Sequence, residues 1–408
     1  MTISTNDGPL AGCRVLEIGS IVAGPYCGRL MADFGADVIK LEAPGGDRLR
    51  GLGKRYKGKS LFFATIHRNK RNISIDLKSE EGRDLVRRLM LESDVVIENL
   101  SPGALDKWGL GYAEMSKVHP RLVMVRISGY GQTGPYADRP GYGIVGEAVS
   151  GLRGIIGDPD RPPPRAAVPL TDYITGVHAA YGVMMALYHR ERTGRGQEID
   201  ATLYESAFSF MESFVPAYEK LGVVPERTGA ALPGSAPNNL YPTADGKFVH
   251  ITSTNDSIFS RLAEAMGRPD LSGDPDWGSD AWRRTHEDEV DAVVGDWTAQ
   301  HDMAALCDIL LAHRVPSGPI NTIADVFEDP HFRARDMLVE VPDEDLGSVT
   351  LGGVVPKLSE TPGGLRHTGH DKGADTRAVL AERLGLTAEV LDRLEADGVI
   401  LSKGEPPQ

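Results

Sequence analysis

Cysteines, paired histidine ligands and long apolar runs are all scarce in this sequence. Only three cysteines occur among 408 residues, an odd number at spacings that fit neither a metal site nor a disulfide framework. None of the eleven histidines belongs to an H-E-x-x-H motif or a comparable ligand pair. We therefore expect no metal centre, and the cysteine usage favours the reducing cytoplasm over an oxidising compartment.

Segments typical of membrane or exported proteins are also missing. The longest apolar stretch, Val177 to Tyr188, is interrupted by His178 and is far shorter than the ~20 residues needed to cross a bilayer. The first residues, MTISTNDGPLAG, have neither the basic start nor the apolar core of a signal peptide. We expect no membrane segment, and we interpret the apolar stretch as part of a buried helix.

Basic residues are outnumbered, 44 against 58 acidic ones, which gives a formal net charge of −14. This balance argues against broad binding to nucleic acid or to an anionic membrane. It does not exclude an anionic small ligand, because a local group of basic side chains can lie on an acidic protein.

The first half of the chain alternates strand-like and helix-like segments. A helix is predicted over Pro25–Phe34, and another opens at Ser79, with Glu80 and Glu81 in its first turn. Strands are predicted at 14–18, 37–41, 72–77, 95–98 and 122–127. This alternation predicts an α/β fold with a largely parallel, Rossmann-like sheet.

The later part of the chain has a different organisation. A stretch rich in glycine and proline, residues 128–169, predicts a long and functionally interesting loop before an apolar helix over about 171–192. The composition shifts after about residue 222. Asp245-Gly246 then predicts a β-hairpin, and short amphipathic helices follow over 257–313. We expect a second, smaller α+β domain here.

Two G-x-G-x-x-G matches, at Gly129–Gly134 and Gly141–Gly146, suggest a dinucleotide site at first sight. However, Pro135 and Pro140 bracket the stretch after the first match, so the required helix cannot start there normally. We interpret these glycines as turn residues. The sequence also has no P-loop and no G-x-S-x-G nucleophile motif.

Asp172 lies where the long loop passes into the apolar helix. From physical chemistry alone, an aspartate in this place is an N-cap or a first-turn residue that complements the helix dipole.

A series of short motifs adds information about this residue. The motifs occur in order along the chain: Ala23-Gly24-Pro25, Asp33–Glu42, Asn69-Lys70-Arg71, Asp76-Leu77-Lys78, Glu98-Asn99, Pro102-Gly103, Gly129–Gln132, Gly134-Pro135, Asp172 with Gly176, and Thr193-Gly194-x-Gly196-Gln197. Together they resemble the family III CoA-transferases, also called the CaiB/BaiF or carnitine/bile-acid family. The resemblance is strong over about residues 10–210 and weaker beyond.

The resemblance implies a CoA-transferase in which Asp172 attacks an acyl-CoA thioester and carries an acyl anhydride and then a CoA thioester. A carboxylate suits this role because it is ionised at neutral pH without a helper base. CoA is implied as the acyl carrier, with a carboxylic acid as acceptor and no metal. From the resemblance and from basic residues at predicted strand ends, we expect these residues to contact CoA: Lys40, Arg50, Arg71, Lys78, Asn99, Lys107 and Tyr142.

Two departures from family patterns narrow the function. Formyl-CoA:oxalate transferases have glutamine where this chain has Val22. The 2-methylacyl-CoA racemases have Gly-His-Asp where this chain has Gly141-Tyr142-Gly143, and a racemase needs two acid–base groups. We therefore favour CoA transfer. The alternatives are a racemase or epimerase with a different second base, and a non-catalytic acyl-CoA-binding paralogue.

The resemblance also implies an interlocked homodimer. It predicts a large CoA-binding domain over residues 1–222, a small domain over 223–328, and a C-terminal segment, 329–408, that returns to the large domain. Acyl-CoA and a carboxylic acid are the expected partners.

Overall fold

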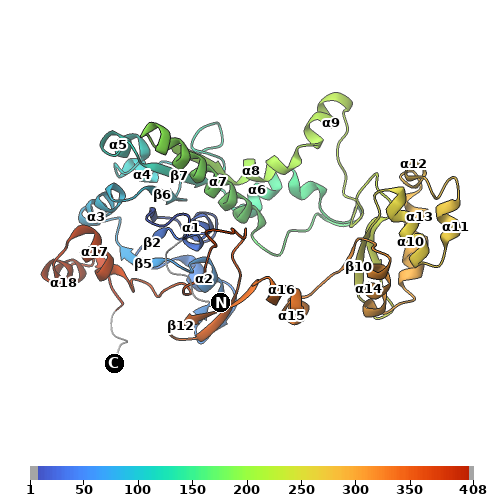
Figure 1. Ribbon diagram of the computed structural model, residues 1–408. Helices are drawn as coiled ribbons and strands as arrows, with labels where there is room; N and C mark the ends of the chain where they lie inside the picture. The colour runs from blue at the N-terminus through green and yellow to red at the C-terminus, as the bar shows by residue number, and fades with distance from the viewer. Residues whose placement is uncertain (1–7, 404–408) are drawn as a thin grey trace. The chain divides into compact units, whose positions relative to one another are not determined.

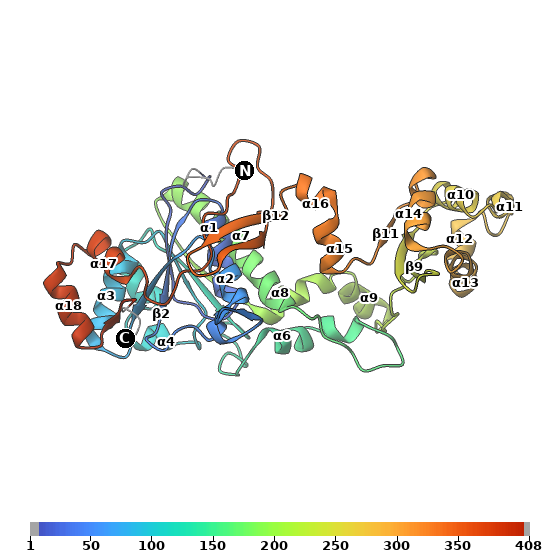
Figure 2. The same cartoon turned by 90° about the horizontal axis from the view of Figure 1, so that it is seen from below.

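The computed structural model describes residues 8–403 (Figures 1 and 2). The chain folds into two compact units. The first contains the residues up to Leu152, then 166–216 and the residues from His331 onward, and the second contains 153–165 and 217–330. The sequence-based boundaries at 222/223 and 328/329 therefore lie close to two of these divisions. The inclusion of 153–165 in the second unit has no counterpart in the prediction.

The first unit is built on a seven-stranded sheet in the order β14-β5-β2-β1-β6-β7-β8. The strands β5, β2, β1, β6, β7 and β8 pair in parallel. Their bounds are β1 Arg14–Glu17, β2 Asp37–Glu42, β5 Arg71–Ile75, β6 Val95–Glu98, β7 Val123–Ser128 and β8 Glu198–Thr202. Every residue of β6 and β7 is buried, as expected for central strands of a parallel sheet. The predicted α/β class with a parallel sheet is confirmed.

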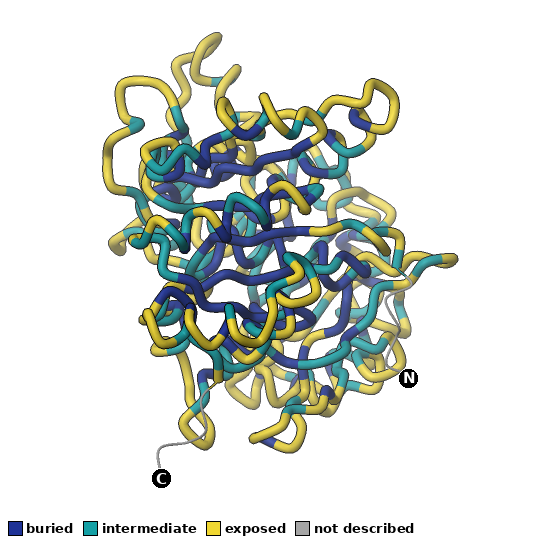
Figure 3. The backbone as a smooth tube through the Cα atoms, turned by 90° about the vertical axis from the view of Figure 1, so that its left-hand side faces the viewer, coloured by how far each residue is buried: buried dark blue, intermediate teal, exposed yellow. Residues whose placement is uncertain are grey.

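Helices cover both faces of this sheet, because alternate strand residues point in opposite directions. Leu16 packs with α3, α17 and α18, whereas Val15 packs with α1 and α7. Figure 2 shows these two helix groups on opposite sides of the strands, and Figure 3 shows buried segments, in dark blue, in the interior of the molecule. The bounds are α1 Ala23–Asp33, α3 Glu80–Leu91, α7 Leu170–Thr193, α17 Thr376–Leu384 and α18 Ala388–Ala396.

The C-terminal segment adds an edge strand to the same sheet. Strand β14, Ile400–Leu401, pairs antiparallel with β5. The Thr376 hydroxyl accepts a hydrogen bond from the Ser74 N–H, and the Asp375 carboxylate accepts one from the Asn72 N–H. The antiparallel edge strand was not predicted from the sequence.

The remaining elements of this unit are short. The long predicted loop contains α6 (Gly143–Val149) and the 3₁₀ helix η2 (Leu152–Ile155), of which only Leu152 belongs to this unit. A hairpin of β12 and β13 precedes the C-terminal helices. The other bounds are η1 Arg48–Gly51, β3 Arg55–Tyr56, β4 Lys59–Ser60, α2 Leu61–Ile66, α4 Ala104–Lys107, α5 Tyr112–Val118, α8 Leu203–Phe208, η3 Ser209–Met211, α16 Pro330–Ala334, β12 Leu338–Asp343 and β13 Gly347–Gly352.

The second unit has a three-stranded antiparallel sheet in the order β11-β10-β9. The predicted hairpin is confirmed, with Gly246 at φ +72° in its turn, a conformation that favours glycine. The bounds are α9 Phe214–Leu221, β9 Asn238–Pro242, β10 Phe248–Thr252, α10 Asp256–Ala265, α11 Pro269–Gly273, α12 Asp280–Arg283, α13 Glu287–Thr298, α14 Met303–Ala312, β11 Ser317–Pro319 and α15 Ile323–Glu328. Within residues 8–403, no helix combines the length and apolar character that a membrane span requires.

Candidate active site

A cavity of about 310 Å³ lies at the carboxyl edge of the seven-stranded sheet. Its walls come from the segments that follow β1, β6 and β7 and from the first turn of α7, which supplies Asp172. Arg48, residues 139–142 and Leu203 complete the lining. Because the carboxyl ends of parallel strands meet at one edge, segments far apart in the chain converge here, as in the ligand sites of open α/β sheets.

A second cavity, of about 340 Å³, adjoins the first along the same edge. The two cavities share Ser20, Arg48 and Leu100 in their linings. The second is also lined by residues that follow β2 and β5, including Lys78, and by Trp108. Together the two cavities follow the sheet edge from β5 to β7, an arrangement that suits an elongated ligand.

Asp172 is the one acidic side chain among the described residues that line the first cavity. It is the third residue of α7, whose N-cap is Pro169, so Asp172 is a first-turn residue and not the cap. Burial raises the pKa of the Asp172 carboxyl to about 6, although its own backbone N–H partly counters this. The carboxylate is therefore mostly ionised at pH 7, yet poorly hydrated, which is a suitable state for a nucleophile.

Gly143, the first residue of α6, gives the Asp172 carboxylate its room. A Cβ atom placed on Gly143 would lie 1.9 Å from Oδ2 and 2.8 Å from Cγ of Asp172, far inside van der Waals contact. Any side chain at this position would displace the carboxylate. The glycine that we interpreted from the sequence as a turn residue is therefore required by a close approach to Asp172.

The loop after β1 is held in a strained conformation on the cavity wall. Ile21 has φ +67°, which is rare for a β-branched residue and costs of order 1–3 kcal/mol. The side chain of Asn99 accepts a hydrogen bond from the Ser20 N–H at 2.7 Å and donates one to the Ser20 carbonyl at 2.9 Å. Asp47 accepts one from the Ile21 N–H at 3.2 Å. These bonds fix the Ser20–Ile21 segment beside Asp172.

The buried side chain of Lys40 stabilises this loop. Its ammonium group lies 3.0 Å from Asp47 and 3.5 Å from Glu17, and it donates a hydrogen bond to the Gly19 carbonyl. Only 1% of the lysine is exposed. Lys40, which was predicted to contact CoA, lines the second cavity, and its charge is paired with these two carboxylates.

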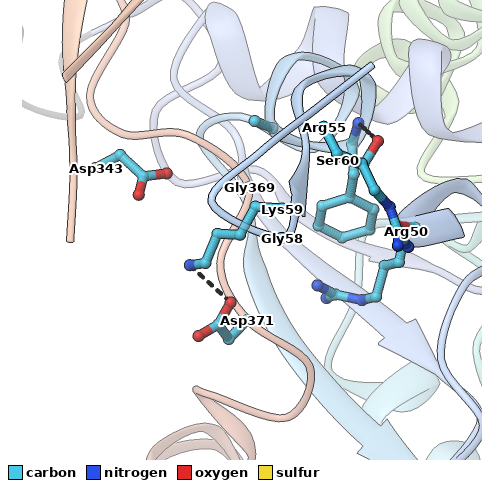
Figure 4. A pocket seen from close by; sticks show the side chains of 10 residues that line it. Arg50, Arg55, Gly58, Lys59, Ser60, Asp343, Gly369 and Asp371 are labelled. Atoms are coloured by element: carbon cyan, nitrogen blue, oxygen red, sulfur yellow. Dashed lines mark hydrogen bonds and ion pairs between the residues drawn. The ribbon is translucent and has the colours of Figure 1, made fainter. Parts of the chain in front are cut away.

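Two other predicted CoA ligands, Arg50 and Arg71, line neither cavity and have carboxylate partners. Arg50 lies 2.6 Å from Glu42 and lines a different cavity of about 270 Å³, shown in Figure 4. Arg71 is the first residue of β5, at the opposite edge of the sheet, and lies 2.7 Å from Asp37 and 2.6 Å from Glu382.

The remaining predicted residues are distributed as follows. Asn99 and Tyr142 line the Asp172 cavity, and Lys78 lines the adjoining one. Lys107 is exposed at the end of α4 and lines neither cavity. Arg139 lines the Asp172 cavity although sequence reasoning did not select it. Its place in the long loop 128–169 was the available signal.

Over the part of the chain that the structure describes, no group of three or more histidine, cysteine, aspartate or glutamate side chains could hold a metal ion.

The sequence matches the profile of CoA-transferase family III over residues 10–376. The chain belongs to this family. It is 46% identical over 394 residues to a succinyl-CoA–D-citramalate CoA-transferase of Chloroflexus aurantiacus, with 96% of this chain and 98% of that protein covered. It is 44% identical to the succinyl-CoA–L-malate CoA-transferase beta subunit of the same organism, with 96% and 98% covered.

A solved structure shows the same fold. A CaiB/BaiF family protein from Brucella suis superposes with a TM-score of 0.83 at 36% identity, covering 92% of this chain and 100% of that one. The family predicted from the sequence is confirmed, and the protein is a CoA-transferase.

The contact between Gly143 and Asp172 gives a steric prediction. Gly143→Ala should displace the carboxylate by an ångström or more and lower kcat about 100-fold, since misplacement on this scale is costly in catalysis. Steady-state kinetics would measure the effect. Gly273→Ala is the matched control, because that helical glycine has nothing within 4 Å of an added Cβ. Equal activity of the two variants would contradict the close approach.

The buried charge of Asp172 gives a stability prediction. The folded-state pKa of about 6 exceeds the ordinary 3.8, so ionisation of Asp172 opposes folding above pH 6 and ceases to matter below about pH 4. Asp172→Asn should raise the free energy of unfolding by about 1–3 kcal/mol at pH 8, and by about half as much at pH 5. Urea unfolding at both pH values would measure this.

Asp325 provides a control of opposite sign for the stability measurement. Its pKa is lowered by hydrogen bonds from Thr322 in the capping box of α15. Asp325→Asn should therefore lose stability at pH 8. A less stable Asp172→Asn protein at that pH would show that the Asp172 charge is not desolvated.

Proposed function

We propose that this enzyme transfers CoA from a dicarboxylic acyl-CoA, such as succinyl-CoA, to another carboxylic acid through covalent intermediates on Asp172. The observation that carries this proposal is a half-buried carboxylate, with no ion-pair partner among residues 8–403, in a cavity at the carboxyl edge of the sheet. The proposed substrates are those in the names of the most similar relatives that we compared.

In the first half of the reaction, an Asp172 carboxylate oxygen attacks the thioester carbonyl carbon of the donor. The carbon–sulfur bond breaks, CoA leaves as a thiolate, and a mixed anhydride joins Asp172 to the acyl group. The thiolate then attacks the carbonyl carbon of Asp172. The donor acid leaves as a carboxylate, and Asp172 holds CoA as a thioester.

The second half reverses these steps with a new acid. A carboxylate oxygen of the acceptor attacks the Asp172 thioester and releases the CoA thiolate, which gives a second anhydride. The thiolate attacks the acyl carbon of the acceptor, so the acyl-CoA product forms and Asp172 is free again. Over the full cycle one CoA thioester is replaced by another, so the exchange needs no external energy source.

Two helix N-termini support the negative charge that develops during these attacks. Asp172 lies in the first turn of α7. The N-terminus of α1 adjoins the same cavity through Val22 and Ala23, and Val22 caps α1 without a side-chain hydrogen bond. The unsatisfied N–H groups at such ends, together with the helix dipoles, favour an oxyanion nearby.

CoA would lie along the two adjoining cavities. Lys78 and Arg48 would face its phosphates, while Asn99 and Tyr142 would lie near the end that carries the thioester. Lys107, exposed close to this edge, remains a candidate phosphate contact. Lys40, Arg50 and Arg71 would act indirectly, because each already has a carboxylate partner.

We further propose that the enzyme is a cytoplasmic, interlocked homodimer. The three cysteines are free thiols, as the cytoplasm favours. Four apolar residues at helical spacing on α7 are about half exposed or more and would be covered by a second copy: Val177, Tyr181, Met185 and Tyr188. Intertwined chains should not release a folded monomer on dilution. Sedimentation at low micromolar concentration would test this, and a folded monomer there would contradict it.

The covalent role of Asp172 predicts that the residue is labelled during turnover. Borohydride or hydroxylamine added with acyl-CoA should modify Asp172, and mass spectrometry of peptides would locate the change. Asp172→Asn should be inactive although folded and able to bind CoA, because an amide cannot form the anhydride.

Asparagine is a conservative replacement for this test. If Asp172 only complemented the dipole of α7, the asparagine variant would keep much of its activity, since the fold tolerates an uncharged residue there. Full transfer activity in Asp172→Asn, with no deamidation detected, would overturn the mechanism.

A further inference from the structure

The lining of the Asp172 cavity contains two basic side chains for one acidic side chain. Its ionisable lining, among the described residues, consists of Arg48, Arg139, Tyr142 and Asp172. The two arginines have no carboxylate within ion-pairing distance in the described part of the chain. This contrasts with Lys40, Arg50 and Arg71, which all have one. Because two guanidinium groups line the cavity with a single carboxylate, a further negative group of the substrate could bind there without a net excess of negative charge.

The two arginines differ in position along the sheet edge. Arg48 lines both cavities and therefore lies at their junction, on the side of Lys78. Arg139 lines only the cavity of Asp172. If CoA runs from the second cavity toward Asp172, Arg48 lies on the CoA side of the reacting carbon, and Arg139 is the one available to the acyl group.

Arg139 is also held in place by aromatic contacts. Its guanidinium carbon lies 3.5 Å from the ring centroid of Tyr136, which packs edge-on against Tyr130 at 5.8 Å. Tyr130 in turn contacts Tyr204, at 5.8 Å. A guanidinium stacked by its face keeps its N–H edge free, and that edge matches a carboxylate with two parallel hydrogen bonds. The stack reduces the entropy lost when a carboxylate binds.

From these observations we infer that Arg139, positioned by Tyr136, binds the second carboxylate of a dicarboxylic acyl group and so selects dicarboxylic over aliphatic substrates. This inference rests on the proposed function. A single isolated arginine on a protein surface is ordinarily a solvated charge. Here the cavity, the absence of a carboxylate partner and the tyrosine stack together distinguish Arg139 from that case.

The experiment compares succinyl-CoA with butyryl-CoA, which has a methyl group in place of the second carboxylate. The readout is the ratio of kcat/KM for the two donors with one fixed acceptor. Arg139→Gln should lower this ratio roughly 100-fold, because a charge-assisted pair is lost only with succinyl-CoA. Arg139→Lys should lower it less, since lysine keeps the charge but not the planar fork.

Two control variants separate this role from others. Arg48→Gln should lower kcat/KM for both donors together, since it removes a contact to CoA, which they share. Arg192→Gln removes another arginine that lies over a tyrosine, 5.7 Å from the ring centroid of Tyr188, but outside both cavities, and it should not change the ratio.

The outcomes that would overturn the inference are distinct from those that would overturn the proposed function. The inference would be overturned if Arg139→Gln left the ratio unchanged. It would also be overturned if a folded variant that binds CoA lost activity equally with both donors. A wild-type enzyme with no activity toward any dicarboxylic acyl-CoA would overturn the proposed substrate class, and this inference with it.

Discussion

A fully buried lysine organises the active edge of the sheet. The Lys40 ammonium group donates a hydrogen bond to the carbonyl of Gly19 and forms ion pairs with the carboxylates of Asp47 and Glu17. Asp47 in turn accepts the N–H of Ile21. Breaking a buried pair of this kind by removing one partner costs about 3–5 kcal/mol. The strained loop beside Asp172 therefore persists because a buried ionic network, and not local preference, determines its conformation.

Asp172 contrasts with Lys40, because its carboxylate has no ion-pair partner among the described residues. The same fold that pairs Lys40 with two carboxylates gives Asp172 no ion-pair partner within residues 8–403, only helix N-termini and a cavity. An unpaired, half-buried carboxylate opposes folding, yet it is poorly hydrated and therefore reactive. Gly143 preserves this state, since a larger residue would fill the space that the carboxylate occupies.

Sequence patterns predicted the helices and strands better than they predicted which charged side chains form ion pairs. The parallel strands and the hairpin at Asp245-Gly246 follow from periodicity and turn chemistry, which are local. The antiparallel β14 and the helix α6 in a loop rich in glycine depend on tertiary packing. The same holds for Arg71, which looked free in the sequence because one of its partners, Glu382, lies 311 positions further along the chain.

The pairing of charged side chains determines which basic residues are available to attract a substrate. An acidic protein with a formal charge of −14 can attract an anionic substrate only where its cations are not already neutralised. Lys40 and Arg50, which lie near the end of β2, are each paired with a carboxylate, and each pair contributes little field at the cavity. Lys78 and Arg48, on the proposed CoA side, and Arg139, on the proposed acyl side, have no carboxylate partner among residues 8–403. The spacing of these three along the edge is therefore the feature that could match the several negative groups of a dicarboxylic acyl-CoA.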